Sequence, residues 1–164
     1  MTGGRRQRKS GSALGFWLAL AALCSLGTPG VEAADGPVAV NPNNGLAISG
    51  FDPVAYFTDR RPEFGRPDLE LRSKGVVWRF ANVGDRDAFA DHPEVYAPRF
   101  GGYDPVAIAR GLSVPGYPLF WAIAGERLYL FYSAAARATF LAAPGRIIAA
   151  ARRKWPKVAQ TVAQ

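Results

Sequence analysis

Few residues in this 164-residue sequence could carry out chemistry, and they are widely spaced. The only cysteine is Cys24 and the only histidine is His92. A lone histidine in a loop is more often a solvated or capping side chain than a metal ligand. Two aspartates recur in one context, Asp52 in Phe-Asp-Pro-Val-Ala and Asp104 in Tyr-Asp-Pro-Val-Ala. Aspartate before proline can bond free backbone N–H groups, so each is predicted to cap its own loop.

Two more demanding hypotheses for these residues stay open. Asp52 and Asp104 could act as paired acid/base carboxylates if the fold brings them together. Alternatively, His92 and Asp85 could join them in an oxygen-rich metal site, although no spacing demands one. The chain contains no GxSxG elbow and no glycine-rich phosphate loop. We therefore predict no catalytic residue, no metal and no cofactor.

The residues best suited to contact a ligand lie on the glycine-rich loop Tyr-Ala-Pro-Arg-Phe-Gly-Gly at 96–102. Loops that join two structural units often border a cleft, so Tyr96, Arg99 and Tyr103 are predicted to be exposed there. Asp52 and Asp104 are retained as further ligand-binding candidates. The tyrosines at strand positions, Tyr129 and Tyr132 among them, are predicted to belong to the core.

The N-terminal segment has the pattern of an export signal. Four basic residues at positions 5–9 precede an apolar run at 12–26, and Val31-Glu32-Ala33 fits a signal peptidase site. We expect a signal peptide at 1–33, cleavage after Ala33, and a periplasmic or secreted protein. An uncleaved membrane anchor is the alternative, but the run is shorter than the roughly 20 residues that span a bilayer. After cleavage we expect no membrane span.

Much of the positive charge belongs to this segment. Residues 1–33 hold four of the 20 basic and one of the 13 acidic residues, so their removal lowers the net charge from +7 to +4. The remaining basic residues do not alternate with exposed aromatics, so a nucleic-acid partner is not expected. Cys24 is removed too, which leaves no thiolate and no internal disulfide.

The rest of the chain reads as two versions of one unit. Phe51 to Ala55 matches Tyr103 to Ala107 at an offset of 52, and Trp78 to Pro93 matches Tyr129 to Pro144 at an offset of 51. Each half, 50–96 and 103–147, is predicted to contain a loop, a β-hairpin and a short helix. The hairpins are expected at 69–80 and 121–132, and the helices at 84–91 and 134–141.

The predicted fold class is therefore α+β, with two pseudo-symmetric halves packed as one domain at 46–157. A helix from Arg146 to about Trp155 closes the domain, because Ile147, Ala151 and Trp155 form one apolar stripe. Residues 34–45 are predicted to be a flexible arm and 158–164 a tail.

The motifs AISGFDPVAYF (47–57), GVVWRF (75–80), FADHPEVYAPRFGGY (89–103) and ERLYLFYS (126–133) resemble the YHS domain family in its exported, single-domain form. In relatives, cysteines at a DPVC loop and a strand-to-helix corner hold a metal ion. In the first half, those cysteine positions correspond to Ala55, Ala81 and Asp85. In the second half, they correspond to Ala107, Tyr132 and Ala136. A further cysteine of exported relatives, after the Gly-Gly-Tyr segment, corresponds to Asp104. None is a cysteine.

The resemblance thus implies the fold but not the thiolate site. The expected function is a non-catalytic binding module of the bacterial envelope, whose partner is a small ligand or an envelope protein. A metal accessory protein, for example for copper, with a non-thiolate site is one alternative. An enzyme that uses Asp52 and Asp104 is the other.

Overall fold

The computed structural model describes residues 1–4 and 36–163. The chain divides into two units, Met1–Val31 and Glu32–Gln164. In the first unit, residues 1–4 are exposed and have no regular structure. The rest of the predicted signal peptide and its cleavage site after Ala33 lie outside the described residues. No helix in the described part of the chain has the length and apolarity needed to cross a bilayer.

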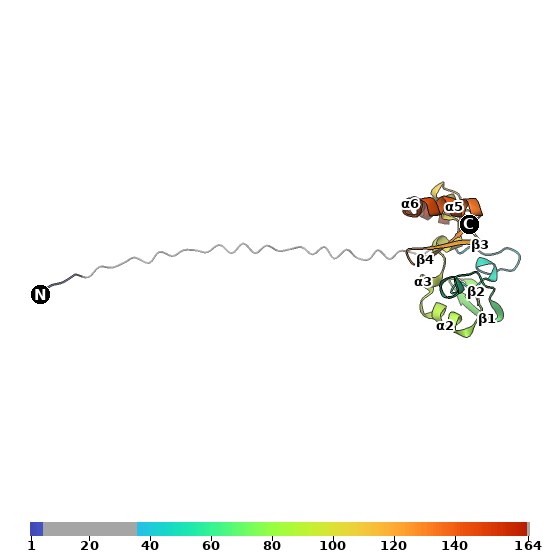
Figure 1. Ribbon diagram of the computed structural model, residues 1–164, viewed down its shortest axis with the longest axis horizontal. Coiled ribbons are helices and arrows are strands. Elements are labelled where there is room, and N and C mark those ends of the chain that lie inside the picture. The colour runs from blue at the N-terminus through green and yellow to red at the C-terminus, as the bar shows by residue number, and fades with distance from the viewer. Residues whose placement is uncertain (5–35, 164) are drawn as a thin grey trace. The chain divides into compact units, whose positions relative to one another are not determined.

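The second unit has the predicted α+β architecture, with two small antiparallel sheets and a long C-terminal helix (Figure 1). In chain order its elements are η1 (Ile48–Gly50), α1 (Ala55–Thr58), β1 (Arg66–Ser73), β2 (Val76–Phe80), α2 (Val83–Asp91), α3 (Pro93–Tyr96), η2 (Arg99–Gly102), α4 (Pro105–Ala109), β3 (Tyr117–Ala124), β4 (Arg127–Phe131), α5 (Ala134–Ala142) and α6 (Pro144–Val162).

Both hairpins close through tight two-residue turns with left-handed backbone. Lys74 and Gly75 have φ of 50° and 79°, and Gly125 and Glu126 have φ of 55° and 58°. Such turns match the twist of the strands that they join. Each hairpin also contains an irregularity near its open end, between the pairs Arg66–Phe80 and Glu70–Arg79 in β1–β2. The same break recurs in β3–β4.

The internal repeat extends to the backbone hydrogen bonds. The N–H of Asp52 donates to the carbonyl of Glu63 at 2.8 Å, and the N–H of Asp104 donates to the carbonyl of Val114 at 2.8 Å. Before each aspartate lies a left-handed turn of three residues. In η1, Ile48, Ser49 and Gly50 have φ of 41°, 59° and 83°, and in η2 the corresponding residues have φ of 55°, 61° and 87°.

The two halves do not pack symmetrically. In each half one aromatic helix residue, Phe89 or Phe140, packs on the aromatic face of its hairpin. Leu128 and Leu130, on the other face of β4, are fully buried in the core of the first half. Their counterparts in β2, Val77 and Arg79, are only half-buried. The hairpin β3–β4 therefore supplies both cores and lies between α5–α6 and the first half in Figure 1.

The C-terminal helix is longer than predicted. Helix α6 begins at Pro144 and continues through Pro156 to Val162, and Val158 is buried. The prediction of a tail from residue 158 is therefore wrong for 158–162. The predicted stripe of Ile147, Ala151 and Trp155 does face the core.

The segment predicted as a flexible arm is also part of the fold from residue 36 onward. The N–H of Ala39 donates to the carbonyl of Gly101 at 2.8 Å, and Val40 forms a β-bridge with Ala47. Gly36 lies against the ring of Trp155, where a Cβ would come within 2.6 Å of it. Residues 34 and 35 of the predicted arm lie outside the described residues.

Candidate functional site

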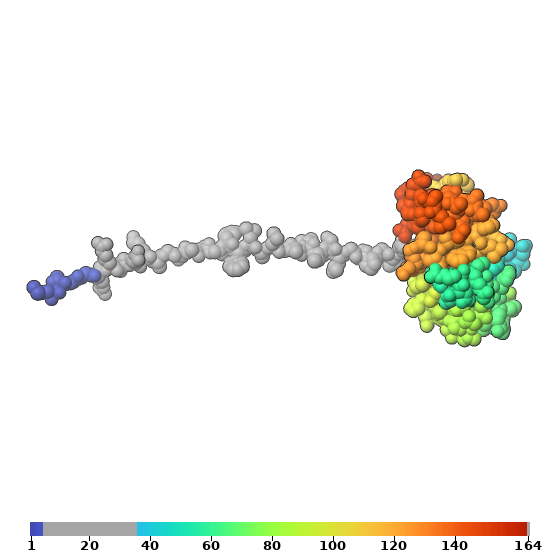
Figure 2. Space-filling view, in the orientation of Figure 1, coloured from blue at the N-terminus to red at the C-terminus, as the bar shows by residue number. Residues whose placement is uncertain are grey.

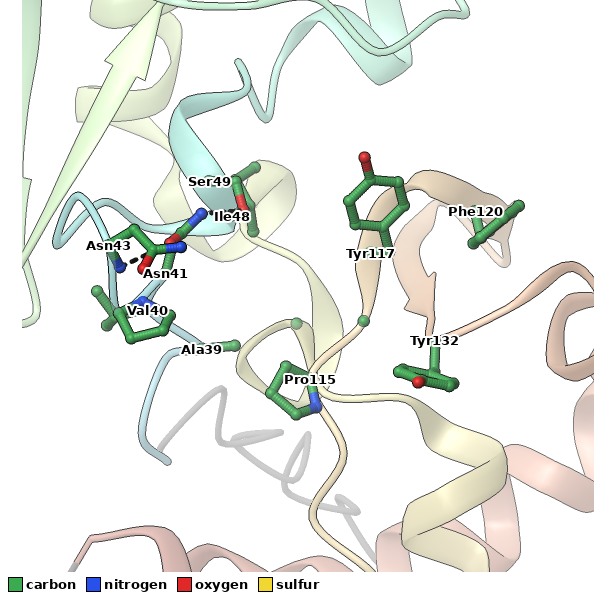
Figure 3. Close-up of a pocket in the computed structure, with 13 residues that line it drawn as sticks. Ala39, Val40, Asn41, Asn43, Ile48, Ser49, Pro115, Tyr117, Phe120 and Tyr132 are labelled. Carbon is green, nitrogen blue, oxygen red and sulfur yellow. Dashed lines mark hydrogen bonds between the residues drawn. The ribbon is translucent and has the colours of Figure 1, made fainter.

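A cleft of about 550 Å³ lies between two walls of the second unit (Figure 3). One wall is formed by the segment 39–43 and by η1. The other is formed by β3 and the residue after β4. The lining residues are Ala39, Val40, Asn41, Pro42, Asn43, Ile48, Ser49, Gly102, Pro115, Gly116, Tyr117, Phe120 and Tyr132. None of these residues carries a charge.

The first wall is built by asparagine turns. The Asn41 side-chain oxygen accepts a hydrogen bond from the N–H of Asn43 at 2.9 Å, and the Asn44 oxygen accepts one from Leu46 at 3.0 Å. Such Asx turns reverse the chain without a regular element. The amide of Asn41 also donates to the hydroxyl oxygen of Ser49 at 3.2 Å, which ties the segment to η1. The asparagine-rich stretch is therefore a shaped surface.

The left-handed turn η1 contributes Ile48 and Ser49 to this wall. A positive φ is a rare conformation for a β-branched residue, yet Ile48 has φ of 41°. Strained backbone of this kind persists only where its surroundings enforce it, and it is concentrated at binding sites. Here the bond from Asn41 and the burial of Ile48 hold the turn. Both residues border the cleft from this turn.

The second wall presents three aromatic rings, from Tyr117, Phe120 and Tyr132. Residues three apart in a regular strand point to opposite faces. The bulge in β3 between Tyr117 and Trp121 breaks that alternation, and the rings of Tyr117 and Phe120 lie 5.8 Å apart. The hydroxyl of Tyr56 donates to the carbonyl of Pro118 at 3.1 Å and fixes the bulge. Tyr117 is 50% exposed and Tyr132 is 65% exposed.

The floor of the cleft requires close approach of backbone. A Cβ at Gly116 would lie 2.8 Å from the carbonyl oxygen of Gly102 and 2.5 Å from Leu130. A Cβ at Gly101 would come within 2.1 Å of the carbonyl oxygen of Pro37. Gly101 thus allows residues 37 and 38 to pass beside the loop at 96–102.

The residues predicted for ligand contact do not line this cleft. Arg99 and Tyr103 are each 7% exposed, so the prediction that they are exposed is wrong. The ring of Tyr103 packs against Trp155 with centroids 5.8 Å apart, and burial raises the pKa of its hydroxyl. Tyr96 is half-buried and its ring contacts Phe57 edge-on at 5.5 Å. The predicted loop reaches the cleft only through Gly102.

Asp52 and Asp104 are buried and have the predicted capping role. One carboxylate oxygen of Asp52 accepts from the N–H of Val54 at 2.8 Å, and the other accepts from Ala81 at 2.7 Å. Asp104 accepts from Val106 at 2.7 Å and from Tyr132 at 3.0 Å. Each carboxylate therefore joins its loop to the end of the following hairpin, and both of its oxygens are occupied by backbone.

Asp85 lies close to Asp52 and changes its titration. Burial, followed by the neighbouring carboxyl group of Asp85, raises the pKa of Asp52 to about 6. The amide of Asn82 donates to Asp85 at 2.9 Å, and Asn82 also caps α2. The pair is enclosed by protein atoms and faces neither wall of the cleft.

His92 is exposed and lies 3.6 Å from the carboxylate of Glu94. No group of three or more histidine, cysteine, aspartate or glutamate side chains that could hold a metal ion occurs among residues 1–4 and 36–163. The geometry thus gives no support to the metal site of His92, Asp85 and the two loop aspartates.

A second hollow, of about 330 Å³, lies beside the first. It is lined by Asp104, Ala107, Tyr132 and Ala136, together with residues of α4, α5 and the loop after α4. Ala107 of α4, Tyr132 of the corner after β4 and Ala136 of α5 come together here. Tyr132 borders both hollows.

Sequence patterns do not reveal the aromatic wall, because a tyrosine at the end of a strand, such as Tyr132, is expected in the core. One signal for an exposed Tyr132 does exist in the repeat. Its counterpart in the first half is Ala81, whose side chain is small.

Comparisons of the chain with family models, with curated proteins and with solved structures returned no match.

Proposed function

We propose that the chain is a non-catalytic binding module, exported to the bacterial envelope and similar to YHS domains, that holds an uncharged ligand in the aromatic cleft. The observation that carries the proposal is the make-up of the cleft. Three aromatic rings face asparagine and serine groups across about 550 Å³, and no charged side chain lines either wall.

The lining defines the chemistry of the ligand. Aromatic rings offer flat apolar surface, and the hydroxyl groups of Tyr117 and Tyr132 add hydrogen-bonding edges. The side chains of Asn43 and Ser49 supply polar groups on the opposite wall. A charged ligand would lose its hydration without a counter-charge, which is costly. A flat ligand with one apolar face and a polar, uncharged edge fits these walls.

The roles of the two aspartates support a binding function over an acid/base one. Both oxygens of Asp52 and of Asp104 already accept backbone N–H groups. The convergence of Ala107, Tyr132 and Ala136 in one hollow supports the likeness to YHS domains.

Two dyes test whether the cleft prefers an uncharged ligand to an anionic one. Nile red is flat and uncharged and emits strongly in apolar sites, whereas anilinonaphthalene sulfonate is flat and anionic. We expect Nile red to bind with the higher affinity. Tyr117→Ala should weaken its binding about five- to tenfold, because one stacked aromatic contributes about 1 kcal/mol beyond its buried area.

The matched control is Leu141→Ala, which removes an exposed apolar side chain from α5, outside the cleft. It should leave Nile red binding unchanged. Equal loss in both variants, or tighter binding of the anionic dye, would contradict the proposal.

A further inference from the structure

The charge of the described domain is divided unevenly along the chain. Residues 36–126 hold nine basic and eleven acidic residues, whereas residues 127–164 hold seven basic and no acidic residue. Solvated surfaces of ordinary domains mix both signs. Strand β4, α5 and α6, which follow Glu126, therefore carry charge of a single sign.

Three of these cations share one line on α6. Arg146, Arg153 and Lys157 are spaced seven and four residues apart, which places them on the same side of a helix. That side is nearly opposite the one formed by Ala151, Trp155 and Val158, which are buried. All three cations are exposed, and none of their side chains has a hydrogen bond or an ion pair with another described residue.

The helix is firmly held beneath this line. The ring of Trp155 contacts those of Phe100 and Tyr103, with centroids 5.7 Å and 5.8 Å apart. Helix α6 forms a continuous part of the surface, red in Figure 2. The three cations therefore project from a rigid element along about 16 Å, at 1.5 Å per residue.

A favourable interaction with the helix dipole does not explain the pattern. Cations suit the last turn of a helix, but Arg146 is the third residue of α6, where the dipole disfavours positive charge. No acidic residue lies three or four positions away to compensate.

We infer that this line on α6 is a docking surface for an anionic lipid bilayer. A straight row of cations on a convex helix can reach a flat anionic surface along its whole length at once, and Arg152 and Lys154 flank the row on either side. A nucleic acid is disfavoured, because the only aromatic residue of α6, Trp155, is buried and cannot stack on a base.

Vesicle binding tests the inference on the protein purified from the envelope of an expressing bacterium. We expect it to bind vesicles of mixed phosphatidylglycerol and phosphatidylcholine, to bind phosphatidylcholine vesicles weakly, and to be released by salt. Arg146→Gln, Arg153→Gln and Lys157→Gln combined should weaken the anionic binding about a hundredfold, or about fivefold for each cation.

The charge-matched control is Arg61→Gln, Arg66→Gln and Arg72→Gln combined, which removes three exposed cations from the first half. It should bind like the unmodified protein. Because both triple variants change only exposed side chains, both should retain the original melting temperature.

Three outcomes would overturn the inference: equal losses in the two triple variants, equal binding to both kinds of vesicle, or binding to duplex RNA with none to vesicles. A result on the cleft dyes does not affect this test, because the cleft contains none of the substituted residues.

Discussion

The carboxylate of Asp104 accepts a hydrogen bond from the backbone N–H of Tyr132 at 3.0 Å, across 28 positions of sequence. This bond joins the loop before α4 to the residue whose ring borders the cleft. Asp52 makes the same connection to Ala81 in the first half, at 2.7 Å. The repeated aspartates thus fix the strand-to-helix corners from within.

Asp104→Asn should destabilise the fold. An amide has one acceptor oxygen where the carboxylate has two, so one of the N–H groups of Val106 and Tyr132 loses its partner. A buried donor without a partner costs about 2 kcal/mol in the free energy of unfolding. Urea unfolding measures the loss. Asp87→Asn, at an exposed ion pair, should change the free energy by less than about 0.5 kcal/mol, and an equal loss there would contradict the role of Asp104.

The stability should depend on pH through Asp52. Its pKa is raised from 3.8 to about 6 in the folded protein, so between these values the folded state binds the proton that the unfolded state releases. The resulting stabilisation is complete below about pH 4 and is lost as pH rises through 6. The free energy of unfolding should therefore fall by up to about 2 kcal/mol as pH rises from 4 to above 6, after allowance for solvent screening.

Asp85→Asn provides the comparison for this pH dependence. It removes the neighbouring carboxyl group that adds to the pKa shift, so the unfolding free energy should fall less between pH 4 and 6 than in the unmodified protein. Identical pH profiles for the two proteins would show that Asp85 does not act on Asp52.

Gly101→Ala should release the segment that forms the first wall. A Cβ at this position would lie 2.1 Å from the carbonyl oxygen of Pro37. Gly111→Ala is the control, since its φ of 85° is also positive but nothing lies within 4 Å of the added atom. Both substitutions should lower the free energy of unfolding by about 1 kcal/mol, because alanine disfavours a positive φ. Gly101→Ala should lower the free energy of unfolding further and should speed hydrogen exchange at the N–H of Ala39. Equal exchange rates in the two variants would contradict the close contact between Gly101 and Pro37.

Truncation should show whether residues 158–162 stabilise the fold as part of α6. Ending the chain at Lys157 removes the buried Val158 and the last turn of α6. Burial of one valine contributes about 2 kcal/mol, so the melting temperature should fall clearly. Ending the chain at Val162 should have no effect. If both truncated chains melt like the full chain, residues 158–162 are dispensable.

The hairpins and helices were predictable from sequence because local patterns determine them. The hairpins expected at 69–80 and 121–132 form as β1–β2 and β3–β4, and the helices expected at 84–91 and 134–141 form as α2 and α5. The duplicated motif predicted the second half by analogy with the first. These signals act over a few residues, or repeat at a fixed offset, so one sequence is enough to detect them.

The cleft was not predictable in the same way. Its walls come from segments near residues 40, 48, 116 and 132, and no periodic pattern links them. The asparagine turns before Leu46 resemble a flexible arm in composition, and only their contacts with Gly101 and Ser49 show otherwise. Exposure of Tyr117 and Tyr132 likewise depends on a bulge and on the end of a strand. Such features are set by tertiary packing.

The burial of Leu128 and Leu130 against the first half has a consequence for biosynthesis. The first half lacks part of its core until β4 has left the ribosome, so neither repeat can complete its folding early. The core of the first half is therefore complete only when residues of both repeats are present.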